Sequence, residues 1–317
     1  MDKVLVTGAS GFIGQALVEA LVPNYEVWCT YERAEHKAKN PKIPGSQKVL
    51  MNLKDPYGID NVVELVKPHF VIHLGAKTEV EYSFQDYHDV SLVDYVGTVD
   101  LAEANRRLNP NLKCFIMAST METYGFGQNP TPFTEGTPQH PAAPYAVAKT
   151  ACEHYLRYME YAYRFPFVAL RLTNTYGRYD NDYFVMERII TQMLDGQVCN
   201  LGNPRPYRNF LYIDDLVELF QRVLKVADQD IGVLKGQVFV TGPDNAVTIQ
   251  DLAEMVKERL GWSGVINWDT IPVRPGEIYY LNSDPEKAKR LLNWEPKTPL
   301  SRGIDKTIAT WKQNKEE

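Results

Sequence analysis

Two residues of this sequence are spaced so that they could transfer a proton together. Tyr145 and Lys149 are the first and last residues of the segment YAVAK. Because they are four positions apart, a helix would carry both side chains on one face. A phenol has a reference pKa of about 10, and a neighbouring ammonium favours its ionised form. Tyr145 is therefore a candidate general base with Lys149 as its assisting cation. The spacing alone is a weak signal, because it also occurs by chance.

A hydroxyl and a carboxylate follow an apolar run that is typical of a buried strand. The run 113–118 leads into Ser119, Thr120, Met121 and Glu122. Ligands of a parallel sheet bind at the carboxyl ends of its strands. Thr120 is therefore the candidate to bond a reacting oxygen, and Glu122 is a candidate base. The alternative is that Ser119 and Thr120 only cap the following turn and that Glu122 is exposed.

A glycine-rich turn separates the first predicted strand from the first predicted helix. Residues 7–14 read TGASGFIG. The first glycine permits the tight turn, the next lets the backbone approach a pyrophosphate, and the last lets helix and strand pack closely. The helix N-terminus offers free N–H groups to that anion. The pattern predicts a dinucleotide site, and the alternative is a plain tight turn. The residues expected to line it are Gly8, Ser10, Gly11, Phe12, Ile13 and Gly14.

The end of the second predicted strand bears on the choice of cofactor. NAD enzymes commonly place a carboxylate there for the ribose diol. Here Tyr31 stands at that position, and Glu32 and Arg33 follow it. Glu32 could hold the diol, whereas Arg33 could hold a 2′-phosphate. We expect NADP or NAD, with NADP slightly favoured. The alternative is that Glu32 and Arg33 are plain surface residues.

The elements that must position these residues follow an alternating pattern. Short apolar runs alternate with helical patterns over the first two thirds of the chain, which indicates βαβ units and a parallel sheet. The fold class expected is α/β, a Rossmann-type doubly wound parallel sheet. Strands are predicted over 4–6, 25–31, 70–74, 113–118 and 167–171, and helices over 12–21, 61–66, 90–107 and from 145 onward.

After about residue 174 the alternation gives way to short pieces separated by Gly and Pro. We interpret this part as a smaller α/β substrate-binding region near the C-terminus. The chain must return to the sheet at least once within it. The predicted division is 1–173, rejoined by about 207–230, for the dinucleotide-binding domain, and 174–206 with 231–317 for the nucleotide-sugar-binding region.

Composition and charge exclude several classes of protein. The 317 residues are 44% hydrophobic and 23% charged, with a net charge of −6, which disfavours a nucleic-acid partner. The 4 cysteines form no CxxC pair, so no metal site is predicted. No apolar stretch is long enough to cross a membrane. The glycine-rich turn follows the N-terminus too closely for a cleaved signal peptide, and we expect a cytoplasmic protein.

Together, the three motifs resemble the extended short-chain dehydrogenase/reductase family of nucleotide-sugar epimerases and dehydratases, over nearly the whole chain. HLGAK at 73–77 looks like the family segment that lines the cofactor. RLTNTYG at 171–177 resembles R-x-x-N-x-Y-G, whose Asn touches the substrate. RNFLYIDD at 208–215 and RPGE at 274–277 resemble segments whose arginines meet the nucleotide phosphates. Arg suits phosphate because its planar fork donates two bonds, although both arginines could be ordinary surface residues.

The resemblance implies a set of roles. The partner is a nucleotide-diphosphate sugar, and the cofactor is tightly bound and recycled. A homodimer forms through a bundle of the helices at 92–107 and 151–163. The catalytic residues would be Thr120, Glu122, Tyr145 and Lys149. The cofactor would further contact Asn52, Leu53, Leu74, Gly75, Ala76 and Lys77. The substrate would contact Thr78, Glu79, Thr120, Asn174, Arg208, Arg274 and Glu277.

Several details look most like GDP-mannose 4,6-dehydratases, among them Glu122 three residues after Ser119 and the Asp94 of V-D-x-x-G-T. One departure is Met121, which replaces Ser or Asp, because a thioether cannot donate a proton to a leaving hydroxyl. The expected reaction is 4,6-dehydration through transient oxidation at C4. The alternatives are a 4-epimerase, then a decarboxylase acting on a hexuronate, and more remotely a non-catalytic dinucleotide sensor.

Overall fold

The computed structural model describes residues 1–126 and 131–316, in which seven parallel strands form one central sheet. The strand order is β11-β6-β5-β4-β1-β2-β3, and every neighbouring pair is parallel. The predicted doubly wound α/β fold is therefore confirmed. The strands are β1 (Lys3–Thr7), β2 (Glu26–Tyr31), β3 (Lys48–Leu50), β4 (Phe70–His73), β5 (Cys114–Thr120), β6 (Phe167–Leu172) and β11 (Gln237–Val240).

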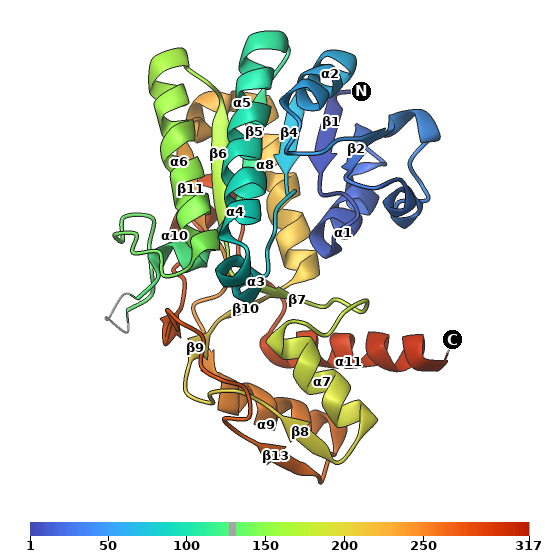
Figure 1. Ribbon diagram of the computed structural model, residues 1–317, viewed down its shortest axis with the longest axis vertical. Coiled ribbons are helices and arrows are strands. Elements are labelled where there is room, and N and C mark those ends of the chain that lie inside the picture. The colour runs from blue at the N-terminus through green and yellow to red at the C-terminus, as the bar shows by residue number, and fades with distance from the viewer. Residues whose placement is uncertain (127–130, 317) are drawn as a thin grey trace.

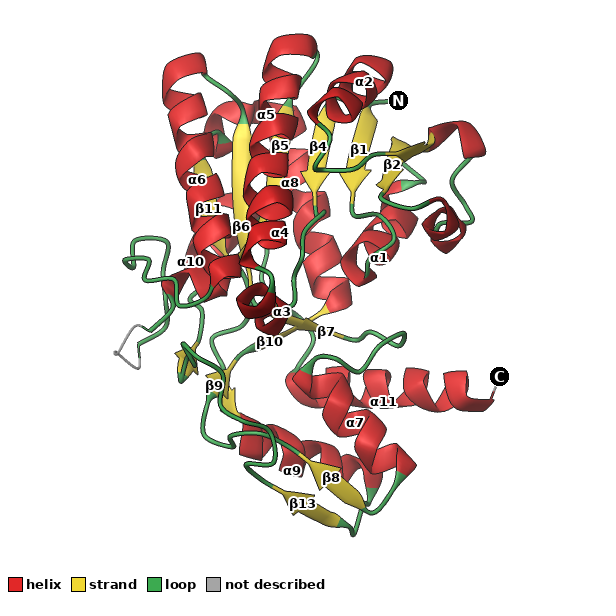
Figure 2. Cartoon of the chain, in the orientation of Figure 1, coloured by secondary structure: helices red, strands yellow, loops and turns green. Residues whose placement is uncertain are grey.

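Helices cover both faces of this sheet (Figures 1 and 2). Successive strand residues point to opposite faces, so Val4 and Val6 join one apolar cluster and Leu5 joins the other. The first cluster is completed by α1 (Phe12–Leu21), α8 (Ile213–Leu234) and α10 (Glu286–Leu292). The second is completed by α2 (Pro56–Val66), α5 (Gly97–Leu108) and α6 (Pro144–Tyr163).

The strand order reverses between β1 and β4. The chain leaves β1 toward α1 on one face, whereas the connection after β4 runs toward α3 (Val80–Gln85) and α4 (Tyr87–Val90) on the other. A crevice opens at such a reversal, beyond the carboxyl ends of the strands. The fold therefore prepares a ligand site at the ends of β1 and β4.

The predicted elements agree with the structure in the first two thirds of the chain. The helix predicted over 12–21 is α1, and the helix after residue 145 is α6. The strand β3 was not predicted, because it is only three residues long. The helix predicted over 90–107 is interrupted: a π-helix, Ser91–Val96, joins α4 to α5.

The second region consists of short strands and three helices, and its apolar core is separate from those of the sheet. The strands form three small sheets: β7 (Asn174–Tyr176) with β10 (Phe210–Tyr212), β9 (Tyr207–Arg208) between β12 (Val247–Thr248) and β14 (Tyr280–Leu281), and β8 (Val198–Asn200) with β13 (Val265–Asn267). The helices are α7 (Val185–Asp195), α9 (Ile249–Leu260) and α11 (Leu300–Glu316).

One predicted boundary differs from the structure. The strand β11 falls inside the segment 231–317 that the sequence assigned to the second region, yet it pairs with β6 at the edge of the central sheet. Helix α10 then packs on the same sheet through Ala288 and Leu292. The boundary near residue 230 was therefore placed too early. The reason is that β11 is only four residues long and lies among Gly- and Pro-rich turns.

The four cysteines are unpaired and buried. Across residues 1–126 and 131–316, none of the helices combines the length and the apolar character needed to cross a membrane.

Candidate active site

A cavity of about 660 Å³ opens at the carboxyl ends of the central strands. Its size is typical of small-molecule sites. It brings most of the predicted site residues together, although they come from seven separate segments of the chain. Those lining it are Gly8, Ser10, Gly11, Phe12, Ile13, Gly14, Glu32, Asn52, Leu53, Leu74, Gly75, Ala76, Lys77, Thr78, Glu79, Thr120, Glu122, Tyr145, Lys149 and Asn174. Arg33, Arg208, Arg274 and Glu277 lie outside this lining.

The glycine-rich turn forms a cradle that side chains would fill. Gly8 has φ +66°, and a Cβ there would lie 2.8 Å from the backbone nitrogen of Gly75. A Cβ on Gly14 would lie 2.3 Å from the carbonyl oxygen of Gly8. Helix α1 begins just beyond, and its N-cap Gly11 offers no side-chain cap to the free N–H groups. This cradle fits a cofactor pyrophosphate, because its residues line the cavity and the first N–H groups of α1 have no side-chain cap.

The end of β2 does not support the predicted preference for NADP. Glu32 lines the cavity, whereas Arg33 is exposed and lies outside it. Tyr31, which stands where a ribose-binding Asp is common, donates its buried hydroxyl to Asn40 Oδ1 at 2.7 Å. The only acidic or basic side chain of this trio at the cavity is therefore a carboxylate, which suits a ribose diol and repels a 2′-phosphate.

Tyr145 and Lys149 lie side by side in the first turns of α6, with 7% and 1% of their surfaces exposed. The Lys149 Nζ lies 5.9 Å from the centre of the Tyr145 ring. Burial raises the pKa of Tyr145, the carboxylates of Asp94 and Glu122 raise it further, and a hydrogen bond with Thr120 lowers it. Burial thus penalises the phenolate more than the Thr120 hydrogen bond favours it. That Lys149 favours the phenolate stays a prediction.

Thr120 and Glu122 lie where β5 ends and a short 3₁₀ turn, η4 (Met121–Tyr124), begins. The Thr120 hydroxyl oxygen accepts the backbone N–H of Glu122 at 3.2 Å, so Thr120 does cap this turn. Its hydroxyl still faces Tyr145. Among the described residues, no hydrogen-bond partner reaches the buried Oε2 of Glu122. The neighbouring Met121 is buried in an apolar cluster and offers no proton.

The predicted phosphate-binding arginines form a compact charged cluster against Glu122. Arg208 Nη2 donates to Glu277 Oε1 at 3.1 Å, and Arg274 Nε lies 3.5 Å from Glu277 Oε2. Arg274 Nη2 also reaches Glu122 Oε1 at 3.4 Å, across 152 positions of sequence. Burial lowers the pKa of Arg208, and the carboxylates of Glu122 and Glu277 oppose this change. An anionic ligand could replace these carboxylates as the partner of both arginines.

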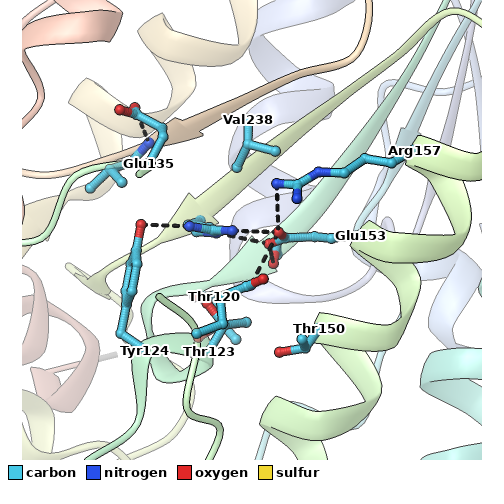
Figure 3. Close-up of polar contacts among 12 residues, drawn as sticks. Thr120, Thr123, Tyr124, Glu135, Thr150, Glu153, Arg157 and Val238 are labelled. Carbon is cyan, nitrogen blue, oxygen red and sulfur yellow. Dashed lines mark hydrogen bonds and ion pairs between the residues drawn. The ribbon is translucent and has the colours of Figure 1, made fainter. Parts of the chain in front are cut away.

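A buried ion pair behind Thr120 fixes α6 against the sheet (Figure 3). Glu153, one turn beyond Lys149, accepts two hydrogen bonds from Arg171 on β6, at 3.0 and 2.6 Å. Ser119 donates to the same carboxylate at 2.6 Å, so it does not cap the following turn. Arg171 also donates to the Tyr124 hydroxyl at 2.6 Å. This network joins β6 to α6, β5 and η4, the three elements that carry the candidate catalytic residues.

His73 forms the buried floor beside the glycine turn. Its Nδ1 lies 2.7 Å from the Thr7 hydroxyl, and its Nε2 lies 2.8 Å from the Thr98 hydroxyl. Thr98 donates to the carbonyl of Asp94, so it must accept from His73 Nε2–H, and Thr7 must donate to Nδ1. Burial lowers the pKa of His73 to about 3. The imidazole is therefore neutral and structural at physiological pH.

The loop after β7 forms a wall of the cavity that was not predicted from the sequence. Arg178 lines the cavity, and its guanidinium carbon lies 3.9 Å from the ring centre of Phe184 and 4.5 Å from that of Phe12. Its Nη1 also forms an ion pair with Glu187 Oε2 at 3.1 Å. Tyr183 lines the same wall. The sequence signal that could have identified this wall is the position of the loop, which leaves the carboxyl end of a strand directly after the segment RLTNTYG.

Comparison with known proteins places this geometry in a family. The model of the GDP-mannose 4,6 dehydratase family matches residues 5–307. The human dTDP-D-glucose 4,6-dehydratase is 30% identical over 98% of this chain and 90% of its own.

Solved structures agree along the whole chain. The UDP-glucose 4-epimerase of Thermotoga maritima superposes with a TM-score of 0.86 at 27% identity, covering 99% of this chain and 100% of that one. The UDP-glucuronic acid 4-epimerase of Bacillus cereus, in complex with UDP-glucuronic acid and NAD, gives a TM-score of 0.86 at 27% identity over 98% and 99%.

The cradle, the Tyr145–Lys149 pair and a family match over nearly the full length lead to one conclusion: the chain belongs to the GDP-mannose 4,6 dehydratase family of extended short-chain dehydrogenases/reductases and is an NAD(P)-dependent enzyme of the nucleotide-sugar dehydratase and epimerase type.

Proposed function

We propose that this enzyme is a nucleotide-sugar 4,6-dehydratase. The observation that carries the proposal is Glu122, whose buried Oε2 has no partner among the described residues and which lines the cavity with Tyr145. A carboxylate at this place can remove a proton from carbon, whereas an epimerase acting only at C4 has no use for a second base. Bound NAD(P) supplies hydride acceptance at C4 and hydride return to the sugar.

The chain's own residues move the protons. Tyr145 takes the proton of the sugar 4-hydroxyl while C4 is oxidised, and Thr120 shares that hydrogen bond. Lys149 stabilises the negative charge that develops on Tyr145. The 4-keto group acidifies C5, and Glu122 takes the C5 proton. Since Met121 cannot donate, Glu122 passes that proton to the C6 hydroxyl, which leaves as water. As hydride returns to C6, C5 would take up a proton from solvent through Glu122, and Tyr145 would release its proton to solvent, so that the protons balance.

The second candidate is a 4-epimerase, and Met121 is the observation that favours it. No acid stands at that position to assist loss of the C6 hydroxyl, and several similar structures are 4-epimerases. In that reaction the 4-keto sugar turns over and Glu122 takes no part. Decarboxylation of a hexuronate ranks third. A non-catalytic sensor is disfavoured, because Thr120, Tyr145 and Lys149 meet in one cavity.

The proposed substrate is a nucleotide-diphosphate sugar. Arg208 and Arg274 would exchange the carboxylate of Glu277 for the diphosphate, and Thr78, Glu79 and Asn174 would contact the sugar.

For the cofactor we propose NAD rather than NADP, because Glu32 and not Arg33 lines the cavity. The division into a dinucleotide-binding domain and a nucleotide-sugar-binding region is part of the same proposal, with β11 moved to the first. A cytoplasmic location is also proposed, since four buried unpaired cysteines suit a reducing compartment.

We further propose a homodimer. A shallow groove between the π-helix region and α6 is lined by Tyr87, Tyr95, Val147 and Ala151. Val147 and Tyr87 are 52% and 67% exposed. A second copy of α5 and α6 would cover this apolar surface and form the helix bundle expected from the family resemblance.

The test is a product assay. The enzyme is incubated with GDP-mannose, UDP-glucose, dTDP-glucose, CDP-glucose and UDP-glucuronate, and the product masses and NMR spectra are recorded. Loss of water from one substrate supports the dehydratase, and Glu122→Gln should then abolish it. A new stereoisomer of unchanged mass would replace the dehydratase by the epimerase, and Glu122→Gln would then turn over nearly as fast as the unaltered enzyme.

A further inference from the structure

Arg178 is a buried cation with unused hydrogen-bond donors at the cavity. Only 6% of its surface is exposed, and it lines the cavity. Its Nη1 donates to Glu187 Oε2 at 3.1 Å, which is the one hydrogen bond of this guanidinium to the part of the chain that the structure describes. Its Nε is buried and has no partner among those residues. A guanidinium has five N–H donors, so most of those of Arg178 are left without an acceptor.

The unused nitrogens of Arg178, Nε and Nη2, form one planar fork. Arg171 shows what such a fork binds, because its Nε and Nη2 donate to the two oxygens of Glu153 at 3.0 and 2.6 Å. Two rings hold the plane of the Arg178 guanidinium, whose carbon lies 3.9 Å from the ring centre of Phe184 and 4.5 Å from that of Phe12. Rings contact the face of a guanidinium and leave its edge available, so the fork suits an anion with two oxygens.

Glu187 does not fully balance this cation. Its Oε1 accepts the backbone N–H groups of Gly177 and Arg178 at 3.1 and 3.3 Å, so one oxygen of the carboxylate serves the backbone. Burial lowers the pKa of Arg178, although Glu187 and, more weakly, Asp180 oppose the change. Burial also raises the pKa of Glu187 against the effect of Arg178. Desolvation of this pair thus exceeds its attraction, and a further anion beside Arg178 would stabilise the cation.

The contact with Phe12 places Arg178 beside the dinucleotide cradle. Phe12 is the first residue of α1, and the N-terminus of that helix has no side-chain cap. Arg178 comes from the loop between β7 and α7, in the second region. Its guanidinium therefore reaches from the second region to the helix end that fits a pyrophosphate. Arg208 and Arg274, the proposed partners of the sugar nucleotide, lie outside the lining of this cavity.

We propose that Arg178 is a cofactor-binding residue, whose Nε–Nη2 fork donates to the pyrophosphate of the bound dinucleotide. The second region then holds the cofactor together with the glycine-rich turn of the sheet. An enzyme that recycles its cofactor within each turnover works best when release of that cofactor is slow, and Arg178 slows it. The role requires the dinucleotide site alone and does not depend on which sugar reaction the enzyme catalyses.

The experiment measures binding of NAD, NADP and ADP-ribose to the full chain, freed of bound cofactor, by isothermal titration. Arg178→Met removes the fork, and we expect all three ligands to bind roughly 10–100-fold more weakly, as for other hydrogen bonds to charged groups. The factor should be the same for each, because all three carry the same pyrophosphate. Arg178→Lys keeps the charge without the fork and should lose part of the affinity. Arg188→Met, on α7 outside the cavity lining, is the control and should lose none.

A second variant separates binding from stability, because Arg178→Met also leaves Glu187 unpaired. Arg178→Met combined with Glu187→Gln removes both charges and keeps an acceptor for the backbone N–H groups of Gly177 and Arg178. We expect this double variant to regain Tm and still to bind NAD weakly. Recovery of NAD affinity together with Tm would mean that Arg178 is only structural and would overturn the proposal. Full NAD affinity in a folded Arg178→Met or, where that variant does not fold, in Arg178→Lys would overturn it as well.

Binding of UDP, GDP and dTDP to the same variants distinguishes the two diphosphate ligands of the enzyme. We expect no change, since Arg208 and Arg274 are the proposed partners of the sugar nucleotide. Weaker binding of a nucleoside diphosphate with unchanged binding of NAD would assign the fork to the substrate and reject the cofactor role. None of these measurements needs turnover. An enzyme that dehydrates no sugar would therefore contradict the proposed function and leave the role of Arg178 intact.

Discussion

At the scale of single residues, the active site combines buried charges that oppose one another. Arg274 lies between Glu122 and Glu277, and the carboxylates of Asp94 and Glu122 both raise the pKa of Tyr145. Buried charges interact strongly because little water screens them. The protonation of Tyr145 is therefore set by a balance of near neighbours rather than by any one of them, and substitution of one neighbour should change rate and pH dependence together.

Replacing Tyr145 by Phe removes the proposed proton acceptor and keeps the ring. We expect kcat to fall by roughly 10²–10⁴, the usual contribution of a general base, while cofactor affinity stays unchanged. Steady-state kinetics and a fluorescence titration with NAD measure the two quantities. Tyr57→Phe, at a position 80% exposed, is the control. Retention of most of the activity by Tyr145→Phe would exclude this residue as the base.

Glu32 and Arg33 allow a direct test of cofactor choice. Glu32→Ala removes the carboxylate that lines the ribose end of the cavity, and we expect NAD to bind roughly tenfold more weakly, a change of about 1.4 kcal/mol. Arg33→Ala should leave NAD binding unchanged, because this side chain lies outside the cavity. Isothermal titration with NAD and NADP gives both affinities. Tighter binding of NADP by the unaltered enzyme, lost in Arg33→Ala, would reinstate the NADP preference.

At the scale of elements, the site depends on how α6 is held against β5 and β6. The Glu153–Arg171 pair is almost completely buried, and both partners use several donors or acceptors (Figure 3). Removal of one partner would leave an uncompensated charge in the core. The register of α6, and with it the position of Tyr145 and Lys149 over the cavity, therefore rests on this pair.

Glu153→Gln should lower the free energy of unfolding by about 3–5 kcal/mol, measured by urea denaturation. The double variant Glu153→Met with Arg171→Met should lose less than either single variant, because neither charge is then left unpaired. Glu160→Gln is the matched control on the same helix. Its pairs with Arg164 and Lys235 lie at the surface, where such pairs contribute about 0–1 kcal/mol. Equal effects at 153 and 160 would contradict the structural role of the buried pair.

At the scale of the whole molecule, two regions contribute to one site. The central sheet supplies the cradle and the Tyr145–Lys149 pair, and the second region supplies Arg178 and Tyr183 to the cavity lining. The proposed phosphate-binding Arg208 and Arg274 lie just outside that lining. The outer face of α6 remains apolar and exposed next to the site, with Val147 between the two catalytic candidates in sequence. Assembly through this face would also brace the helix that carries the chemistry.

Val147→Glu places a charge in the groove that the second copy is proposed to cover. We expect a dimer for the unaltered chain and a monomer for this variant, measured by light scattering after size exclusion. Val265→Glu, at a position 61% exposed on β13, is the control and should remain dimeric. A monomeric unaltered chain at micromolar concentration would contradict the dimer.

The sequence by itself determined the features that depend on near neighbours along the chain. The glycine-rich turn between a strand and a helix predicted the cradle, because Gly14 is required by its contact with Gly8 within one βα unit. The four-residue spacing predicted that Tyr145 and Lys149 share a helix face. Alternating apolar runs predicted the parallel sheet, since burial on both faces requires continuous apolar strands.

Only the tertiary structure decided what depends on distant segments and on burial. Arg274 meets Glu122 across the whole C-terminal half, and no local pattern encodes that contact. Arg33 is a second example. It is adjacent to Glu32 in the sequence, and only the folded chain shows that Glu32 lines the cavity whereas Arg33 does not. The pKa of Tyr145 is raised because the folded chain removes water from the phenol and brings Asp94 and Glu122 near it. Desolvation and long-range charge are properties of the packed molecule, so the sequence could name the catalytic candidates but not the balance of charges around them.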